Sequence, residues 1–143
     1  EQGEEIWWLI EPCRSTEVIK YSGTMSHPTY RPDLLGRTME TFAHFIYLES
    51  NKHVVMANLQ GTPSLLGNGD DGIILFDPMT HTVESNSGVG DHGNAGINKF
   101  TADHHYWTLC QSFKFDPLHD EGLDGSEEHP RRLGESMGSQ TLG

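Results

Sequence analysis

The spacing of apolar residues predicts two main helices separated by short strands and polar loops. The first helix is expected over residues 34–48, where apolar side chains recur at helical spacing; they are Leu35, Met39, Phe42, Phe45 and Ile46. Asp33 directly precedes this run and is a favourable N-cap residue, because its carboxylate can accept a hydrogen bond from a backbone N–H of the first turn.

A second helix is expected from Asn94 onward, because the apolar pattern continues along a single helix face. The positions on that face are Ile97, Phe100, Trp107, Cys110 and Phe113. Residues 80–93, directly before this helix, are polar and glycine-rich, which is typical of a loop.

Short apolar runs bounded by turn residues predict strands at residues 6–10, 18–21, 54–59 and 73–76. The first run is partly aromatic and should form a buried strand that ends at Pro12, with the second run as a candidate partner. The stretches between these elements are rich in glycine, proline and polar residues, so residues 22–33 and 61–72 are expected to be loops.

The composition changes after Phe115. Residues 116–143 contain seven acidic residues, few apolar ones and no periodic pattern. Such a segment cannot bury enough apolar surface to offset the entropy of ordering. We therefore expect one domain over residues 1–115 and an acidic, flexible tail over residues 116–143.

The net charge argues against two common classes of partner. The 143 residues carry a formal charge of −12, and such a surface repels nucleic acid and anionic membranes. No apolar stretch is long enough to span a membrane. Two cysteines are too few for the disulfide framework of a small secreted domain. We therefore expect an intracellular, cytoplasmic protein without a nucleic-acid or membrane partner.

Glycines at positions 88, 90, 93 and 96 precede the second expected helix. Successive backbone N–H groups in such a turn, together with the positive end of the helix dipole, can bind a phosphate group. Glycine-rich surface loops without a ligand are common, so an ordinary loop is the alternative interpretation.

Three residues on the two expected helices are candidate metal ligands. His104 and Cys110 are six positions apart, close to two helical turns, and His44 lies on the first helix. Zinc is typically held by about four nitrogen or sulfur donors, so these three would suit it. The alternative is that both histidines are hydrogen-bonded residues of the core.

Polar residues also stand at the ends of two expected strands. Asn58 and Gln60 end one strand, and Asp77 ends another, so the three side chains could converge on a cleft. Asp77 precedes a proline, and the alternative is that it is a plain turn residue.

Five segments, taken in order, resemble the C-terminal lobe of the alpha-kinases, which are atypical eukaryotic Ser/Thr protein kinases. The segments are "WWLIEP", "KYS", "AHFIYLESNKHVVMANLQG", "LFDPMTHT" and "GDHGNAGINKFTADHHYWTLC". The resemblance covers about residues 6–115. It implies an α+β fold with a short mixed or antiparallel sheet, two main helices and a zinc module, and an ATP-dependent kinase activity toward protein substrates or partners.

The resemblance implies a role for each candidate residue of the nucleotide cleft. Glu11 would lie in the hinge whose backbone meets the adenine. Asn58 stands where the family has its catalytic aspartate, Gln60 lies near nucleotide and metal, and Asp77 is the magnesium ligand. The residues that match the glycine-rich loop beside the phosphates are Gly90, Gly93 and Gly96. Those that match zinc ligands are His44, His104 and Cys110.

Three departures from the family pattern point to impaired catalysis. Asn58 replaces the catalytic aspartate, and Tyr106 replaces the middle cysteine of the zinc module. The N-terminal lobe, which in the family carries the lysine that grips the phosphates, has no counterpart in these residues. We therefore expect Mg-ATP binding to be weak or lost. Zinc would need His105 or water as its fourth ligand, unless Tyr106 and Trp107 fill a metal-free site.

Two alternatives to an impaired kinase follow from the same residues. A pseudokinase would use the glycine-rich loop and the acidic tail as a binding or scaffolding module. A metal-dependent hydrolase would reuse the histidines and aspartates, but no paired acid and base stand out in the sequence.

Overall fold

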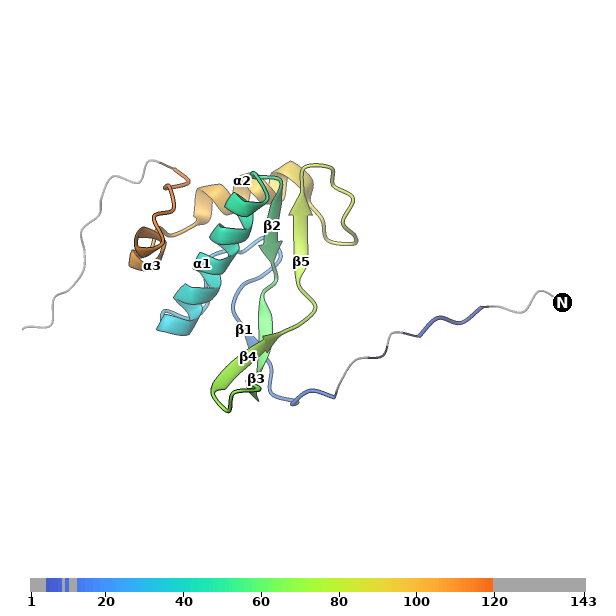
Figure 1. Ribbon diagram of the computed structural model, residues 1–143. Coiled ribbons are helices and arrows are strands. Elements are labelled where there is room, and N and C mark those ends of the chain that lie inside the picture. Colours follow the sequence, from blue (N-terminus) through green and yellow to red (C-terminus); the bar gives the residue numbers. More distant parts are fainter. Residues whose placement is uncertain (1–4, 9, 11–12, 120–143) are drawn as a thin grey trace, which may run out of the picture.

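The computed structural model describes residues 5–8, 10 and 13–119. Within them the order of elements is β1 (Ile19–Lys20), α1 (Leu34–Glu49), β2 (Val54–Ala57), β3 (Gln60–Leu65), β4 (Asp71–Leu75), β5 (Met79–Thr82), α2 (Gly93–Asp103) and α3 (Thr108–Ser112). This is the expected α+β fold, with α1 and α2 as the two main helices (Figure 1).

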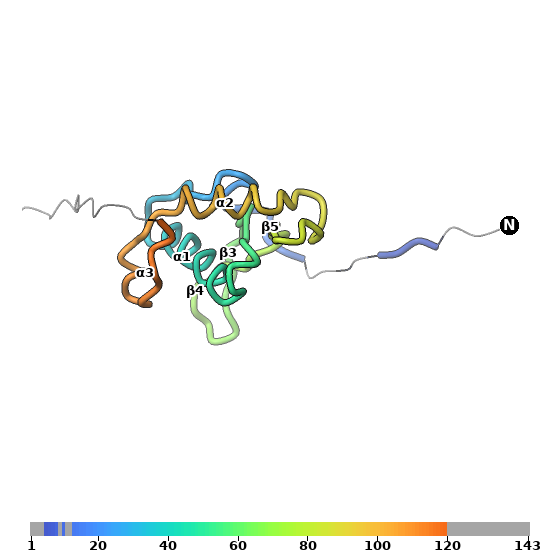
Figure 2. The backbone as a smooth tube through the Cα atoms, turned by 90° about the horizontal axis from the view of Figure 1, so that it is seen from above, coloured from blue at the N-terminus to red at the C-terminus, as the bar shows by residue number. Residues whose placement is uncertain are grey.

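The strands form two small antiparallel sheets. One has three strands in the order β1-β3-β4, and the other pairs β2 with β5. Figure 1 shows the β3–β4 hairpin extending from one end of the β2–β5 pair, so the sheets follow one another along the molecule. Helices α1 and α2 both pack on the β2–β5 pair, and Figure 2 shows α2 running across the top of the molecule.

Helix α1 begins where the sequence predicts. The Oδ1 atom of Asp33 accepts a hydrogen bond from the backbone N–H of Gly36 at 2.9 Å, which confirms the N-cap. The buried face of the helix turns toward β2 and α3. The core between the helices and the sheets is formed by Tyr21, Ala43, Tyr47, Val55, Leu59, Ile97 and Phe100.

The buried strand expected over residues 6–10 is wrong for the part of it that is described. Residues 5–8 and 10 have no regular secondary structure, and the side chains of Trp7 and Trp8 are 86% and 81% exposed. The expected partner forms β1 instead, which pairs with Gln60 and Gly61 at the start of β3. The apolar run thus lacks a neighbouring strand among the described residues, and a strand cannot form without one.

The loop expected over residues 61–72 is also wrong, because it forms most of the β3–β4 hairpin. The segment was polar and contained Pro63, which cannot donate to a ladder. The backbone N–H of Phe76 donates to the carbonyl of Gln60, and hydrogen-bonded pairs alternate along an antiparallel ladder. The backbone nitrogen of Pro63 therefore lies on the side of β3 that faces away from β4. On that side β1 pairs only with Gln60 and Gly61, so no donor is missed.

The second expected helix is interrupted. Helix α2 ends at Asp103, His104 has an extended backbone with ψ of 127°, and α3 begins at Thr108. The reason lies on α1, where the carboxylate of Glu40 accepts the backbone N–H of His105 at 2.9 Å and the indole N–H of Trp107 at 2.9 Å. These bonds hold residues 104–107 away from a helical path.

The segment expected to begin the tail returns to the domain. Leu118 packs against the core, and the ring of His119 lies 2.8 Å from the carbonyl oxygen of Thr101. The remainder of the expected tail, residues 120–143, lies outside the described residues. None of the helices in the described part of the chain has the length and apolar character needed to cross a membrane.

Candidate functional site: a polar pocket and a histidine–cysteine cluster

Asn58 and Asp77 line the same pocket, which has a volume of about 270 Å³. The other residues around it come from the link before β5, from β5 and from the loop that follows, and they are Pro78, Met79, Thr80, Ser87, Gly88 and Val89. Asn58 lies in the link between β2 and β3, and Asp77 lies in the link between β4 and β5. The side chains at the strand ends were expected to converge on a cleft, and the structure brings Asn58 and Asp77 together in one pocket.

Both residues have a left-handed backbone, with φ of 52° at Asn58 and 48° at Asp77. Asparagine and aspartate tolerate this conformation better than other side chains that carry a Cβ atom. Residues in sparsely populated backbone regions cluster at functional sites, where the surrounding structure must hold them. Here the conformation sets the direction in which each side chain leaves the backbone of its link.

The segment Tyr21–Gly23 holds the β2–β3 link in place. The carbonyl of Leu59 accepts the backbone N–H groups of Tyr21 at 2.8 Å and Ser22 at 3.2 Å, and the N–H of Asn58 donates to the carbonyl of Gly23 at 3.0 Å. The hydroxyl of Ser22 accepts the N–H of Leu59 at 3.1 Å. Tyr21 is fully buried, so this support is part of the core.

The other candidate residues of the cleft have different positions. Gln60 is the first residue of β3 and pairs with Lys20, but it is not among the residues that line the pocket with Asn58. Glu11, the expected hinge residue, lies outside the described residues.

Of the three candidate glycines, Gly90 precedes α2 and the other two lie in its first turn, and backbone conformation or packing requires each of them. Gly90 and Gly93 have positive φ of 95° and 57°, and an added Cβ would run into Met79 and Ser85 respectively. Gly96 lies on α2 against the imidazole ring of His81, which an added Cβ would enter. Backbone conformation and close packing therefore account for these glycines whether or not a phosphate binds beside them.

Asp91 organises the loop before α2, and the sequence reasoning missed it. Its carboxylate accepts hydrogen bonds from the N–H and hydroxyl of Thr82, the N–H and hydroxyl of Ser87 and the N–H of Gly93, at 2.6–3.0 Å. Burial alone would raise the pKa of Asp91, but these bonds outweigh it and hold the pKa well below 3.8. Ser87 lines the pocket, so Asp91 fixes part of its wall.

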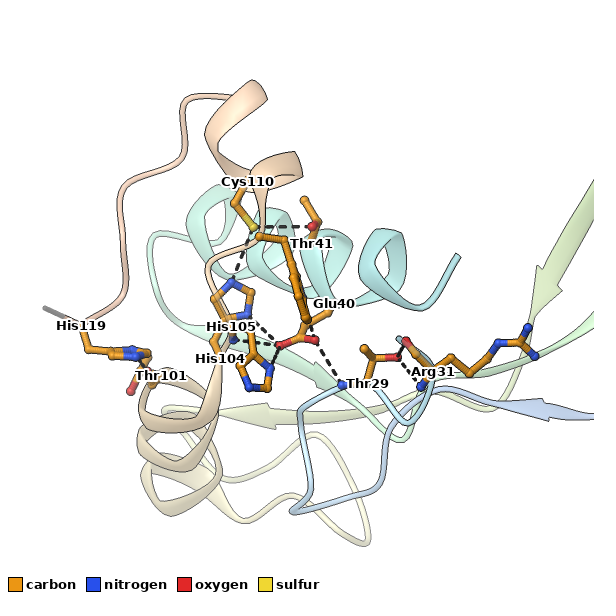
Figure 3. Close-up of polar contacts among 10 residues, drawn as sticks. Thr29, Arg31, Glu40, Thr41, Thr101, His104, His105, Cys110 and His119 are labelled. Atoms are coloured by element: carbon orange, nitrogen blue, oxygen red, sulfur yellow. Dashed lines mark hydrogen bonds and ion pairs between the residues drawn. The ribbon is translucent and has the colours of Figure 1, made fainter. Parts of the chain in front are cut away.

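A second group of side chains lies between α1 and the segment that follows α2. His44, His104 and Cys110 are buried, and one ligand atom of each lies within 4.8 Å of the others. The Nε2 atom of His104 is 3.7 Å from the Sγ atom of Cys110 (Figure 3). The imidazole rings of His44 and His104 are 4.5 Å apart. The break between α2 and α3 lets His104 and Cys110 approach His44.

The two histidines of this cluster are in the protonation state that binds a metal. Burial lowers the pKa of His44, and burial together with the neighbouring imidazoles lowers the pKa of His104 to about 3. Both rings are therefore neutral, which is the form that binds metals. Both nitrogens of His44 and the Nδ1 atom of His104 are buried without a well-formed hydrogen bond, although the backbone of Asp116 interacts with the His44 ring. Because buried polar atoms are normally paired, the arrangement fits zinc better than a hydrogen-bonded core.

Tyr106 stands at the position of the middle cysteine of the expected zinc module. The ring of Tyr106 is 6.4 Å from that of His44, and its hydroxyl donates to the carbonyl of Phe115. His105 does not join the cluster, because its exposed ring lies 3.3 Å from Glu40. A zinc ion at this site would have three protein ligands and an open fourth position.

Two further buried histidines lie beside the loop before α2. The Nε2 atom of His81 lies 2.7 Å from the carbonyl oxygen of Thr24, and its Nδ1 atom accepts the N–H of His92 at 3.1 Å. The ring of His27 packs at 5.5 Å from that of His81, and burial lowers the pKa of His27 to about 4. The positions of these two histidines depend on contacts between segments distant along the chain, so the sequence pattern did not indicate them.

Comparison with known proteins gives one consistent result. The alpha-kinase family model matches residues 1–112. The chain is 32% identical over 116 residues to myosin heavy chain kinase A of Dictyostelium discoideum, which is 80% of this chain and 9% of that protein. It is 26% identical over 123 residues to alpha-protein kinase 1 of the same organism, covering 82% of this chain and 8% of that protein.

Solved structures agree with the sequences. The apoenzyme alpha-kinase domain of myosin-II heavy chain kinase A superposes with a TM-score of 0.60 at 27% identity, over 74% of this chain and 37% of that one. The complex of the same domain with AMP-PNP gives the same score, over 74% and 36%. The chain thus spans less than half of the solved domain and about a tenth of the curated relatives. On these sequence and structural matches, the chain belongs to the alpha-kinase family.

Proposed function

We propose that this chain is the C-terminal lobe of an ATP-dependent Ser/Thr protein kinase domain whose phosphotransfer is impaired. The proposal also gives it a protein substrate or partner in the cytoplasm. The observation that supports it is the pocket lined by both Asn58 and Asp77, the positions that the family resemblance gives to the catalytic aspartate and the magnesium ligand. Myosin heavy chain kinase A has been solved with ATP and with AMP-PNP.

Asn58 is the origin of the proposed impairment. A neutral amide has no useful basicity near pH 7, so it cannot accept the proton of a substrate hydroxyl. The substitution also removes one negative charge beside Asp77, and magnesium prefers carboxylate oxygens. Positioning and charge stabilisation dominate phosphoryl transfer, so slow activity can persist. We therefore expect weak Mg-ATP binding, with Asp77 as the protein carboxylate that would hold the metal and Gln60 beside it.

The second part of the proposal is a structural zinc ion held by His44, His104 and Cys110, with water in the open position. Zinc would supply the positive charge that stabilises the Cys110 thiolate, whose pKa burial raises in the metal-free protein. It would join α1 to the segment that follows α2. Elemental analysis after purification without chelator should give about one zinc per chain, and chelation should lower the melting temperature. No metal and no effect of chelation would show that Tyr106 packing has replaced the ion.

The test of the kinase proposal is Asn58→Asp. Because the chain spans 37% of the solved domain, it is joined behind the N-terminal part of the myosin heavy chain kinase A domain. General-base contributions are typically about 10²–10⁴-fold, so Asn58→Asp should raise phosphate transfer by at least about tenfold. Adding Asp77→Ala should abolish the gain. Asn98→Asp, on the exposed face of α2, introduces the same charge outside the pocket and should change nothing.

The second candidate is a pseudokinase that serves as a binding or scaffolding module, and the missing carboxylate at Asn58 favours it. In that case Asn58→Asp brings a second carboxylate into the pocket of Asp77 without a metal between them. The variant should then melt at a lower temperature than the wild type and gain no activity. Measuring phosphate transfer and melting temperature on the same samples decides between the two candidates.

A further inference from the structure

We infer that Glu40 is a positioning residue for zinc, which holds the His104 ring so that its Nε2 atom faces the metal. The inference rests on the zinc site proposed above. Glu40 is 3% exposed and lies one helical turn before His44 on α1, so a ligand and the carboxylate share one buried face.

The geometry places Glu40 behind the His104 ring. Its Oε1 atom is 3.7 Å from the Nδ1 atom of His104, whereas the Nε2 atom of the same ring is 3.7 Å from the Sγ atom of Cys110 (Figure 3). The two ring nitrogens point to different sides, so one side of the ring meets the carboxylate and the other meets the cluster. Glu40 itself does not lie among the converging ligand atoms.

The chemistry of the two nitrogens follows from this placement. The Nδ1 atom is buried and without a hydrogen-bond partner, and the Glu40 carboxylate is an acceptor that lies 3.7 Å from it. A proton on Nδ1 leaves the lone pair of Nε2 free to bind a metal. Ligating histidines commonly donate their other N–H to a carboxylate, which fixes the tautomer and makes the ligand more basic. A shift of the ring by less than about 1 Å would bring Nδ1 into hydrogen-bond range.

Glu40 is itself held rigidly. Its Oε2 atom accepts the backbone N–H of Thr29 at 3.1 Å and the indole N–H of Trp107 at 2.9 Å, and its Oε1 atom accepts the N–H of His105 at 2.9 Å. Three donors from two separate segments thus fix the carboxylate. The negative charge would offset part of the charge that zinc brings into the buried site.

The experiment compares zinc affinity in Glu40→Gln and Trp107→Phe, measured on the 143-residue chain by competition with a chromophoric chelator under reducing conditions. Trp107→Phe removes one donor to Glu40 and loosens the same segment, but it leaves the carboxylate facing His104. If Glu40 positions His104, zinc binding should weaken by about 10–100-fold in Glu40→Gln and stay within about threefold of the wild type in Trp107→Phe. Equal affinities for all three proteins, or equal losses in the two variants, would overturn the inference.

A second measurement needs no variant. Nitrogen-15 NMR of the zinc-loaded wild type should show His104 protonated at Nδ1 and bound to the metal through Nε2. Coordination through Nδ1 would overturn the role of Glu40 while leaving zinc binding itself established. A wild-type chain that takes up no zinc would instead refute the zinc site, and the role of Glu40 with it.

Discussion

The five hydrogen bonds to Asp91 make this residue the clearest test of how the pocket wall is held. Asp91→Asn keeps the size of the side chain but replaces one carboxylate oxygen by an NH₂ group. The oxygen at Oδ1 can still accept the N–H groups of Thr82 and Gly93, at 3.0 and 2.8 Å. The new NH₂ group faces the N–H of Ser87, which lay 3.0 Å from Oδ2, and two donors cannot bond to each other. The two hydroxyls at this oxygen can rotate to accept.

The expected cost combines one unpaired donor with the loss of charge from the remaining bonds. Hydrogen bonds to charged groups contribute about 1.5–3 kcal/mol each, against about 1 kcal/mol for neutral ones. Ser87 is exposed, so water can satisfy its N–H in part. We therefore expect the free energy of unfolding to fall by about 2 kcal/mol. For a domain of about 100 residues this corresponds to a melting temperature lower by about 8 °C.

The assay is thermal unfolding at several pH values, with Glu84→Gln as the control. Glu84 is exposed in the same loop, so the control removes the same charge without the hydrogen bonds. Because the pKa of Asp91 is lowered in the folded state, its contribution is present above pH 3.8 and is lost as the pH falls further. The difference between Asp91→Asn and the wild type should shrink over that range. Equal melting temperatures for Asp91→Asn and Glu84→Gln at pH 7 would refute the reasoning.

Two further predictions concern the buried histidines. Gly96→Ala should destabilise the domain by about 1–3 kcal/mol, because the added Cβ enters the ring of His81. The control Asn98→Ala, on the exposed face of α2, should leave the stability unchanged. A Gly96→Ala protein as stable as the wild type would contradict the close packing of Gly96 on His81. Since burial lowers the pKa of His27 from 6.5 to about 4, protonation favours the unfolded state and stability should fall as the pH drops from 6.5 toward 4. At pH 5 the loss from His27 is about 2 kcal/mol relative to pH 7.5, and His27→Phe should lack this part of the pH dependence in urea titrations.

The sequence was sufficient to predict the structure where local signals and tertiary packing favour the same conformation. Helix α1 combines an N-cap aspartate with a regular apolar face, so both its start and its direction could be predicted. The spacing of His104 and Cys110 likewise indicated a shared site with His44, although the reasoning assumed a continuous helix. The side chains do converge, but they do so because the helix is broken.

The features that could not be predicted depend on contacts between distant segments. The break after Asp103 is imposed by Glu40, which lies more than sixty positions earlier and had no distinguishing pattern around it. The hairpin at Pro63 is tolerated only because β1 stops short of it. The role of Asp91 could not be predicted, because nothing in the local sequence distinguishes it from another loop aspartate and its five donors are set by the fold. In each case the local sequence favours one structure, and a distant group stabilises another.

The two links between the sheets have a mechanical consequence. The chain passes between the sheets at Asn58, on its way from β2 to β3, and again at Asp77, on its way from β4 to β5. These two links connect one sheet to the other, and both line the pocket. Any bending of one sheet against the other would therefore change the separation of Asn58 and Asp77. The bonds from Tyr21–Gly23 hold the first of these links, and so they oppose a separation of the two side chains.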